Sequence, residues 1–333
     1  MARSRSEIRP RWNPFAHKMK QLGTRWQIAA GKDFVDRLTL MGRSGNGFSV
    51  SESPFGVTED GLLDLRGLRI TEKAELRRVA FSHADFGAAS WKGAWLERCT
   101  FTNAKFDGAG FQKIAEHGNE FIDCSFLKSS FREASLGYKG SSFQRCTFDG
   151  VDFNRAVFVR PEFDGCAFYH CKLDGCDLNG SSFEQCRFVG SLRNVWFRGG
   201  FAHPNDVSRY GQPRANQMTD VSFESACLRD VTFSNGCNLA SVKPPTDGHH
   251  ELIARWPEKL KDLQGRAQSW PSAASKAANA FAATNLVHAR TQDWFILNRD
   301  DLEDEFGSEV AGRILRSLAA TPDSEPPAPA WLS

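Results

Sequence analysis

Nine cysteines carry the most reactive side chains of this 333-residue sequence. Thiols can close disulfides, and as thiolates they can bind a metal such as zinc. A zinc site needs a characteristic spacing, yet neither a pair of CxxC motifs nor an HxxxH spacing is present. The GHH sequence at 248–250 is a weak metal signal that solvated loop histidines explain better. We therefore expect the cysteines to be structural and expect no metal site.

Serine, histidine and aspartate are also present, but not in an arrangement typical of catalysis. The sequence holds no G-x-S-x-G, Walker, HExxH or paired-carboxylate motif in a recognisable context. We therefore expect no enzymatic activity and no cofactor.

The segment from Cys146 to Phe188 repeats with a period of five residues, which neither a helix nor a strand explains. A large apolar residue recurs at every fifth position, and a small or compact residue lies two positions before it. A chain that turns a quarter circle every five residues points both of them at its axis, so four such sides close a square coil. The period predicts a core of large residues: Phe143, Phe148, Phe153, Phe158, Phe163, Phe168, Leu173, Leu178, Phe183 and Phe188.

These units resemble the pentapeptide-repeat family, whose members repeat a small residue, a polar residue, Leu or Phe, and two mostly polar residues. The units begin at Ala74 as AELRR, VAFSH, ADFGA, ASWKG and AWLER, and weaker ones such as VTFSN and CNLAS end near Ser241. Lys139 and Gly140 are two extra residues within the series. The resemblance implies an all-β solenoid over residues 63–241, in the form of a right-handed quadrilateral β-helix.

The repeat also assigns a place to the cysteines, because eight of them occupy the small inward position and only Cys227 does not. A buried thiol acts there as a compact hydrophobe. Cys146, Cys166 and Cys186 are 20 residues apart and should stack on one face, where parallel side chains seldom reach disulfide geometry. The odd count and the burial fit reduced thiols in the cytoplasm.

Glu116 is the misfit of the repeat, because it falls at a large inward position. A carboxylate among stacked rings carries a desolvation penalty of several kcal/mol. We therefore expect the segment 114–118 to bulge outward.

The N-terminal 62 residues lack the repeat and form a basic extension. Residues 1–32 hold eight Lys and Arg against Glu7 alone, a formal charge of +7. One interpretation is an arm that binds nucleic acid or an acidic protein face, through Arg3, Arg5, Arg9, Arg11, Lys18 and Lys20. The other is a solvated tail with a helix over about 17–30, whose Met19, Leu22, Trp26 and Ala30 cover the first coil.

Residues 242–320 show helical spacing of apolar residues, for example at Trp256, Leu260 and Leu263. These helices either cap the last coil or pair with a second copy to form a homodimer. The Pro-rich tail 321–333 is expected to be disordered.

A long interruption at 192–220 combines aromatic side chains with arginines and is the best candidate for partner binding. The predicted binding residues are Arg193, Trp196, Phe197, Arg198, Phe201, Arg209, Tyr210 and Arg214. The alternative is a surface excursion that only folds against the solenoid.

No stretch approaches the 18 consecutive apolar residues of a membrane span, and the N-terminus lacks the apolar core of a secretory signal, so we expect a cytoplasmic protein without a membrane partner. The leading hypothesis is a non-catalytic scaffold that binds a protein partner. The resemblance suggests an alternative, DNA-mimic binding to DNA gyrase or another topoisomerase, and roles in bacterial resistance, immunity or conflict. However, residues 63–242 carry 22 Lys and Arg against 21 Asp and Glu. This near balance does not give the large negative field expected of a DNA mimic.

Overall fold

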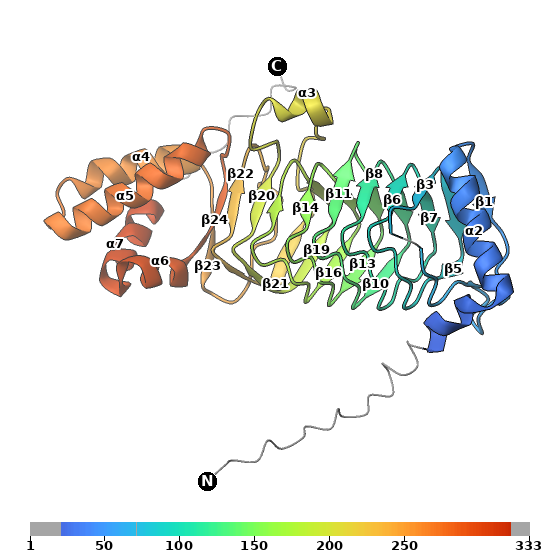
Figure 1. The fold of residues 1–333 in the computed structure, drawn as a ribbon. Helices are drawn as coiled ribbons and strands as arrows, with labels where there is room; N and C mark the ends of the chain where they lie inside the picture. Colours follow the sequence, from blue (N-terminus) through green and yellow to red (C-terminus); the bar gives the residue numbers. More distant parts are fainter. Residues whose placement is uncertain (1–20, 71, 321–333) are drawn as a thin grey trace, which may run out of the picture.

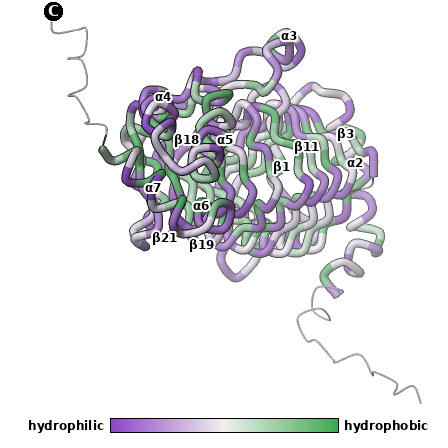
Figure 2. The backbone as a smooth tube through the Cα atoms, turned by 90° about the vertical axis from the view of Figure 1, so that its left-hand side faces the viewer, coloured by the Kyte–Doolittle hydropathy of each residue, from purple (hydrophilic) through white to green (hydrophobic). Residues whose placement is uncertain are grey.

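The computed structural model describes residues 21–70 and 72–320 as a straight solenoid with helices at both ends (Figure 1). The predicted basic arm, from Arg3 to Lys20, and the predicted disordered tail, 321–333, lie outside the described residues. Viewed from its C-terminal end, the solenoid is a stack of similar coils with one short helix, α3, projecting from its side (Figure 2).

Each coil contributes one short strand to a face, and the strands of a face pair in parallel. The first face has seven strands, in the order β1 (Phe48–Val50), β4 (Val79–Ser82), β7 (Thr100–Thr102), β9 (Glu120–Ile122), β12 (Ser142–Gln144), β15 (Glu162–Asp164) and β18 (Ser182–Glu184). The second face holds β2 (Leu63–Asp64), β5 (Ala84–Asp85), β10 (Ser125–Leu127), β13 (Thr147–Asp149), β16 (Ala167–Tyr169), β19 (Arg187–Arg193) and β21 (Ser222–Arg229).

The other two faces complete the square. Isolated parallel bridges form the third face, at Arg69, Ser90, Gly110, Ser130, Asp152 and Lys172. The fourth face holds β3 (Glu75–Arg77), β6 (Trp95–Glu97), β8 (Ala115–His117), β11 (Ser135–Tyr138), β14 (Val157–Phe158), β17 (Asp177–Leu178), β20 (Trp196–Arg198) and β22 (Thr232–Ser234). Four faces per coil confirm the predicted quadrilateral β-helix. The sequence analysis placed the start of the solenoid at residue 63, but strand β1 extends the solenoid toward the N-terminus, to Phe48.

Corners form because residues with a left-handed backbone follow the strands. Two positions after the inward phenylalanines of the first face, Asn103, Asp123 and Arg145 have φ of 51°, 54° and 51°. A single left-handed residue turns the chain sharply without a long loop. The quarter turn inferred from the period therefore has a backbone cause.

The large inward residues stack into columns along the axis. Phe163 lies between Phe143 and Phe183, with ring centroids 5.0 Å and 5.1 Å away and nearly parallel planes. The ten large residues between 143 and 188 that the period placed in the core are all buried. Offset stacking adds to the burial of apolar area, so the columns hold successive coils together.

The cysteines of the small inward position hydrogen-bond as well as fill space. The Sγ atoms of Cys146, Cys166 and Cys186 donate to the carbonyls of Phe121, Phe143 and Phe163, over 3.3, 3.2 and 3.5 Å. All nine thiols are free, and Cys227 alone is exposed. Burial raises the pKa of Cys99 to about 11 and that of Cys237 to about 12, so both stay protonated thiols.

The outward bulge expected at Glu116 is wrong. Glu116 is fully buried and lies in register with the inward Leu96. Three N–H groups donate to its carboxyl group, two from Asn119 and one from Gly137. These donors offset part of the desolvation penalty on which the expectation rested.

The N-terminal cap consists of the 3₁₀ helix η1 (Arg25–Gln27) and helix α2 (Ala29–Ser44), which lies across the first coil. The helix expected at about 17–30 is therefore interrupted, because Ile28 is extended (ψ 160°) before α2 begins. Trp26, Phe34 and Leu38 are buried against the coil, whereas Ala30, which the sequence analysis placed on the covering face, is exposed.

Helices cover the other end of the solenoid (Figure 1). An antiparallel pair, β23 (His250–Ile253) and β24 (Phe295–Asn298), joins a second apolar core made by α4 (Trp256–Ala267), α5 (Ser272–Ala289), α6 (Arg299–Phe306) and α7 (Ser308–Ala319). The Nδ2 atom of Asn298 donates to the Leu228 carbonyl over 2.6 Å, and Arg229 pairs with Asp300 and Asp301. The region contacts the last coil as a cap would, and pairing with a second copy stays a prediction.

Candidate protein-interaction surface

An excursion leaves the solenoid after β20 and carries α3 (Asp206–Tyr210) over the fourth face (Figure 1). The chain returns at Asn216, whose Oδ1 accepts from the Phe183 N–H at 2.9 Å. The excursion therefore spans residues 199–215. It is shorter than the predicted interruption, because residues 192–198 continue the strands β19 and β20.

Polar contacts and an aromatic contact hold the excursion in place. Arg160 donates from Nε to the Tyr210 carbonyl over 2.6 Å and from Nη1 to the Gln212 carbonyl over 3.2 Å. At its start, the Ala202 N–H donates to Asn179 Oδ1 over 2.9 Å. The Tyr210 ring meets Tyr138 edge to face at 5.3 Å. A segment fixed at both ends presents its side chains in a defined arrangement.

Tyr210 extends a row of rings along the outside of the fourth face, formed by Trp95, His117, Tyr138 and Tyr210, which we term the aromatic stripe. Trp95 and His117 stack at 3.9 Å, and His117 and Tyr138 lie 5.2 Å apart. All four side chains are partly exposed. Burial, assisted by the Lys139 charge, lowers the pKa of His117, which favours the neutral ring.

Guanidinium groups flank the stripe. Arg77, Arg78 and Arg98 line a hollow of about 220 Å³ next to Glu97. Arg209 lies over the Tyr210 ring, 4.9 Å from its centroid. Exposed aromatics beside arginines are the side chains most enriched at protein interfaces.

The structure separates the eight predicted binding residues. Phe197 is fully buried in register with Phe233, and Phe201 is 5% exposed, so neither is available to a partner in this structure. Arg209 and Tyr210 lie on α3, next to the stripe. The remaining four lie elsewhere: Arg193 on β19, Arg214 beside Glu162 and Glu184, and Trp196 and Arg198 beside α5.

Sequence reasoning missed Trp95, His117 and Tyr138 as surface residues. They are 22 and 21 residues apart, about one coil each, and each lies one or two positions from an inward residue. A count of outward positions coil by coil would have found the row.

Within the described residues, no group of three or more His, Cys, Asp or Glu side chains is placed to hold a metal ion. None of the helices in residues 21–70 and 72–320 combines the length and apolarity of a membrane crossing.

A square solenoid whose interior is filled by Phe, Leu and Cys belongs to the repeat proteins, which bind through their surfaces. The family model for pentapeptide repeats matches eight copies, over residues 74–113, 139–175 and 162–191. Residues 74–113 and 139–191 of the chain therefore consist of pentapeptide repeats. No curated protein matches the chain.

Solved structures of other proteins are similar to parts of the chain. Full-length QnrB1, a plasmid-mediated fluoroquinolone resistance protein, is 16% identical, with a TM-score of 0.21 and coverage of 52% of this chain and 92% of QnrB1. A trypsin-treated QnrB1 variant gives 16% identity, a TM-score of 0.26 and coverage of 52% and 92%. HetL of the cyanobacterium Nostoc, involved in heterocyst differentiation regulation, is 11% identical, with a TM-score of 0.21 and coverage of 61% and 92%.

Proposed function

We propose that this protein is a non-catalytic scaffold that binds a partner protein through the aromatic stripe and the α3 excursion. The observation that carries the proposal is the contact between Tyr210 and Tyr138, which joins the excursion to the row of rings on the solenoid. A surface built from two segments far apart in the sequence stays in place only if the solenoid is rigid. The stacked columns provide that rigidity.

The chemistry of the surface favours a partner with an apolar patch that carries carboxylates. The rings supply apolar contact area with little loss of side-chain entropy, and Arg98 and Arg209 supply positive charge at the rim. Rim charges of this kind mainly accelerate association and select the partner. Arg214, Trp196 and Arg198 are secondary candidates, because each already contacts another part of the protein. Arg214 pairs with Glu184, Arg198 pairs with Asp177, and the Trp196 ring contacts α5.

The test uses two variants of the full chain. In the first, a short Gly-Ser linker replaces residues 203–211, which removes α3 and keeps the buried Phe201 and β20. In the second, Tyr138→Ala and Tyr210→Ala remove two rings of the stripe. The matched control is Tyr169→Ala, which removes a partly exposed ring from the second face. Affinity capture from the native host, quantified by mass spectrometry, identifies the partner, and titration with the purified partner gives the affinities.

The proposal expects one partner to lose at least about tenfold in affinity with both stripe variants and to be unaffected by the control. Unchanged capture by both variants would contradict it. A supercoiling assay with purified DNA gyrase tests the topoisomerase alternative, which gains support if the protein protects or inhibits the enzyme.

A further inference from the structure

The N-terminal end of the solenoid holds a second surface, made of other residues than the aromatic stripe. A groove of about 790 Å³ runs between helix α2 and the segment that begins with strand β1. Ala30, Phe34, Leu38 and Met41 line it from the helix, and residues 48–54 line its other side. Figure 1 shows α2 and β1 side by side at this end. The volume is within the range of established small-molecule pockets.

Among the described residues, strand β1 is the terminal strand of the first face and pairs only with β4. The Phe48 N–H donates to the Arg78 carbonyl over 3.1 Å, so Phe48, and Val50 two residues later, direct their backbone groups toward β4. Backbone groups alternate in direction along a strand, and Ser49 therefore directs its N–H and C=O away from β4. Within the described chain, no group pairs with this edge of Ser49. An unpaired edge is a template for another strand.

The groove also leaves apolar surface incompletely covered. Phe48 and Val50 are in register with the inward Val79 and Phe81, but they are only half-buried because the described residues form no further coil beyond them. Across the groove, Met41 is 45% exposed. A strand added to β1 would cover Phe48 and Val50 as each coil covers the previous one.

Charge distinguishes the kind of strand that fits. Asp33, Asp36 and Glu52 line the groove, and Arg37 is the only cation among its described lining residues. All three carboxylates are exposed, and none forms an ion pair with another described residue. A net charge of −2 around a backbone edge attracts a segment rich in Lys or Arg and repels an acidic one.

We propose that this groove binds an extended basic segment of another protein, which adds to β1 as a strand. Backbone hydrogen bonds to Ser49 supply part of the affinity. Apolar side chains of the segment cover Phe48 and Val50, and its Lys or Arg side chains meet Asp33, Asp36 and Glu52. Strand addition to an exposed sheet edge is an established way for a domain to capture an extended peptide. The groove and the aromatic stripe share no residue.

The experiment titrates the full chain with a fluorescent ten-residue peptide of alternating Val and Lys and follows fluorescence anisotropy. Ser49→Pro removes the outward N–H and leaves the bonds of Phe48 and Val50 to β4, and Ser49→Ala is its matched control because it keeps the N–H. A triple variant, Asp33→Lys, Asp36→Lys and Glu52→Lys, reverses the charge of the groove. Its control is Glu120→Lys, which changes an exposed carboxylate on β9, three strands away. Thermal unfolding establishes which variants are folded.

Saturable binding to the wild type is expected, with at least about tenfold weaker binding to Ser49→Pro and to the triple variant and unchanged binding to both controls. A peptide of alternating Val and Glu should not bind, and added salt should weaken the binding of the Lys peptide. If Ser49→Pro is unfolded, the triple variant decides.

Four results would overturn the proposal. The first is no binding of the Lys peptide to the wild type, and the second is equal binding of the Lys and Glu peptides. The third is binding that begins only after residues 1–20 are deleted, and the fourth is a dimer that Ser49→Pro dissociates. In the last two cases the occupant would be this chain itself.

Discussion

Glu116 and Asn119 are hydrogen-bonded inside the solenoid, where the Nδ2 atom of Asn119 donates to Glu116 Oε1 over 2.7 Å. The same Nδ2 donates to the Leu96 carbonyl, and the Cys99 N–H donates to Asn119 Oδ1 over 2.8 Å. The other carboxyl oxygen of Glu116 accepts from the Gly137 N–H over 2.6 Å. Glu116 thus occupies a large inward position of the repeat and Asn119 a small one, and the two side chains form hydrogen bonds with each other and with the backbone.

The pH dependence of stability should reveal the protonation of Glu116. Burial raises the pKa of this carboxyl from 4.5 to about 7, although the donors around it oppose the shift. Below pH 4.5 the group is protonated in both states. As pH rises from 4.5 to 7, the unfolded chain loses the proton first, so the stabilisation from this group is lost over that window.

The expected loss is on the order of 3 kcal/mol between pH 4.5 and pH 8. Glu116→Gln cannot titrate, so the difference between wild type and variant in the free energy of unfolding should change across this range. Urea unfolding at half-unit pH steps measures it. Parallel profiles for the two proteins would contradict the raised pKa.

The direction of Glu116 could not be predicted from the sequence, although most of the fold could. A period of five fixes which residues face the axis, because one spacing repeats through coil after coil. The donors to Glu116 come from outside that pattern. Gly137 lies in the coil that contains the two extra residues, where the register of β11 shifts. Its φ is +87°, and a Cβ atom at this position would lie 2.6 Å from the Pro161 nitrogen, so the position requires glycine.

The candidate surface was predictable only in part, for a related reason. Arg209 and Tyr210 stood out as an aromatic and an arginine in an interruption of the repeat. Whether an aromatic in that interruption is exposed depends on where the repeat resumes. Phe197 points inward because β20 pairs with β17 and β22. The five-residue pattern is weak around β20, so the sequence did not predict this pairing.

The columns predict a large penalty for truncating a central ring. Phe143 is 1% exposed and stacks on Phe121 at 4.7 Å and on Phe163 at 5.0 Å. Phe143→Ala should lower the free energy of unfolding by about 3–5 kcal/mol, because it removes buried area and leaves a cavity. Val157→Ala, at a residue that is 51% exposed, is the control and should change it by less than about 0.5 kcal/mol. A similar effect of both changes in denaturant unfolding would argue against the stacked core.

The thiols should divide into two reactivity classes. Cys227 is exposed, whereas the other eight are buried. An accessible thiolate attacks a disulfide reagent and displaces its chromophore, so the native protein should release one equivalent of chromophore per chain and nine after denaturation. Cys227→Ser should abolish the native reaction only. Fast reaction of further thiols in the folded protein would indicate that coils open.

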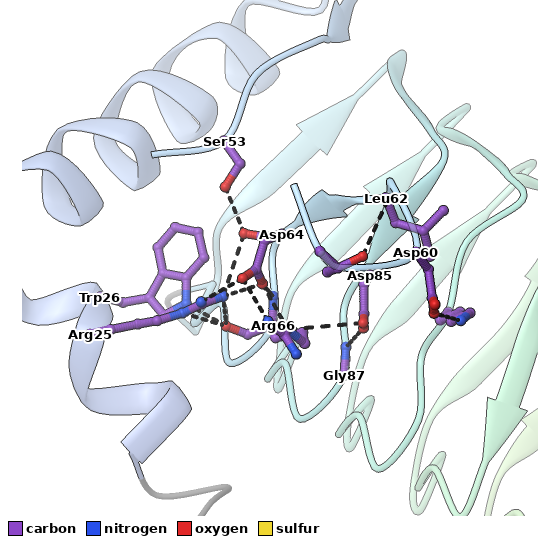
Figure 3. A network of polar contacts seen from close by, with 11 residues as sticks. Arg25, Trp26, Ser53, Asp60, Leu62, Asp64, Arg66, Asp85 and Gly87 are labelled. Carbon is purple, nitrogen blue, oxygen red and sulfur yellow. Dashed lines mark hydrogen bonds and ion pairs between the residues drawn. The ribbon is translucent and has the colours of Figure 1, made fainter. Parts of the chain in front are cut away.

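A buried ion cluster ties the N-terminal cap to the first coil (Figure 3). Asp64, with its side chain 6% exposed, accepts from both Arg25 and Arg66, and the pair of guanidinium groups lowers its pKa against the effect of burial. The Trp26 Nε1–H and the Arg25 side chain donate to the Arg66 carbonyl. This cluster fixes η1, and through it α2, over the open end of the core.

Asp64→Asn should therefore loosen the cap before it affects the rest of the solenoid. The substitution should lower the stability of the cap by about 1.5–3 kcal/mol, because it removes a charge-assisted pair. Both arginines stay partly exposed and can be solvated. Wild-type stabilisation from Asp64 should be present above pH 3.8 and decrease as pH falls below it, since its folded pKa is depressed. Hydrogen exchange at pH 7 compares the cap with the solenoid: amides of α2 should exchange faster in Asp64→Asn than in the wild type, while those of β12 and β15 keep the wild-type rate. Equal acceleration throughout the chain would mean that the cap and the solenoid unfold as one unit.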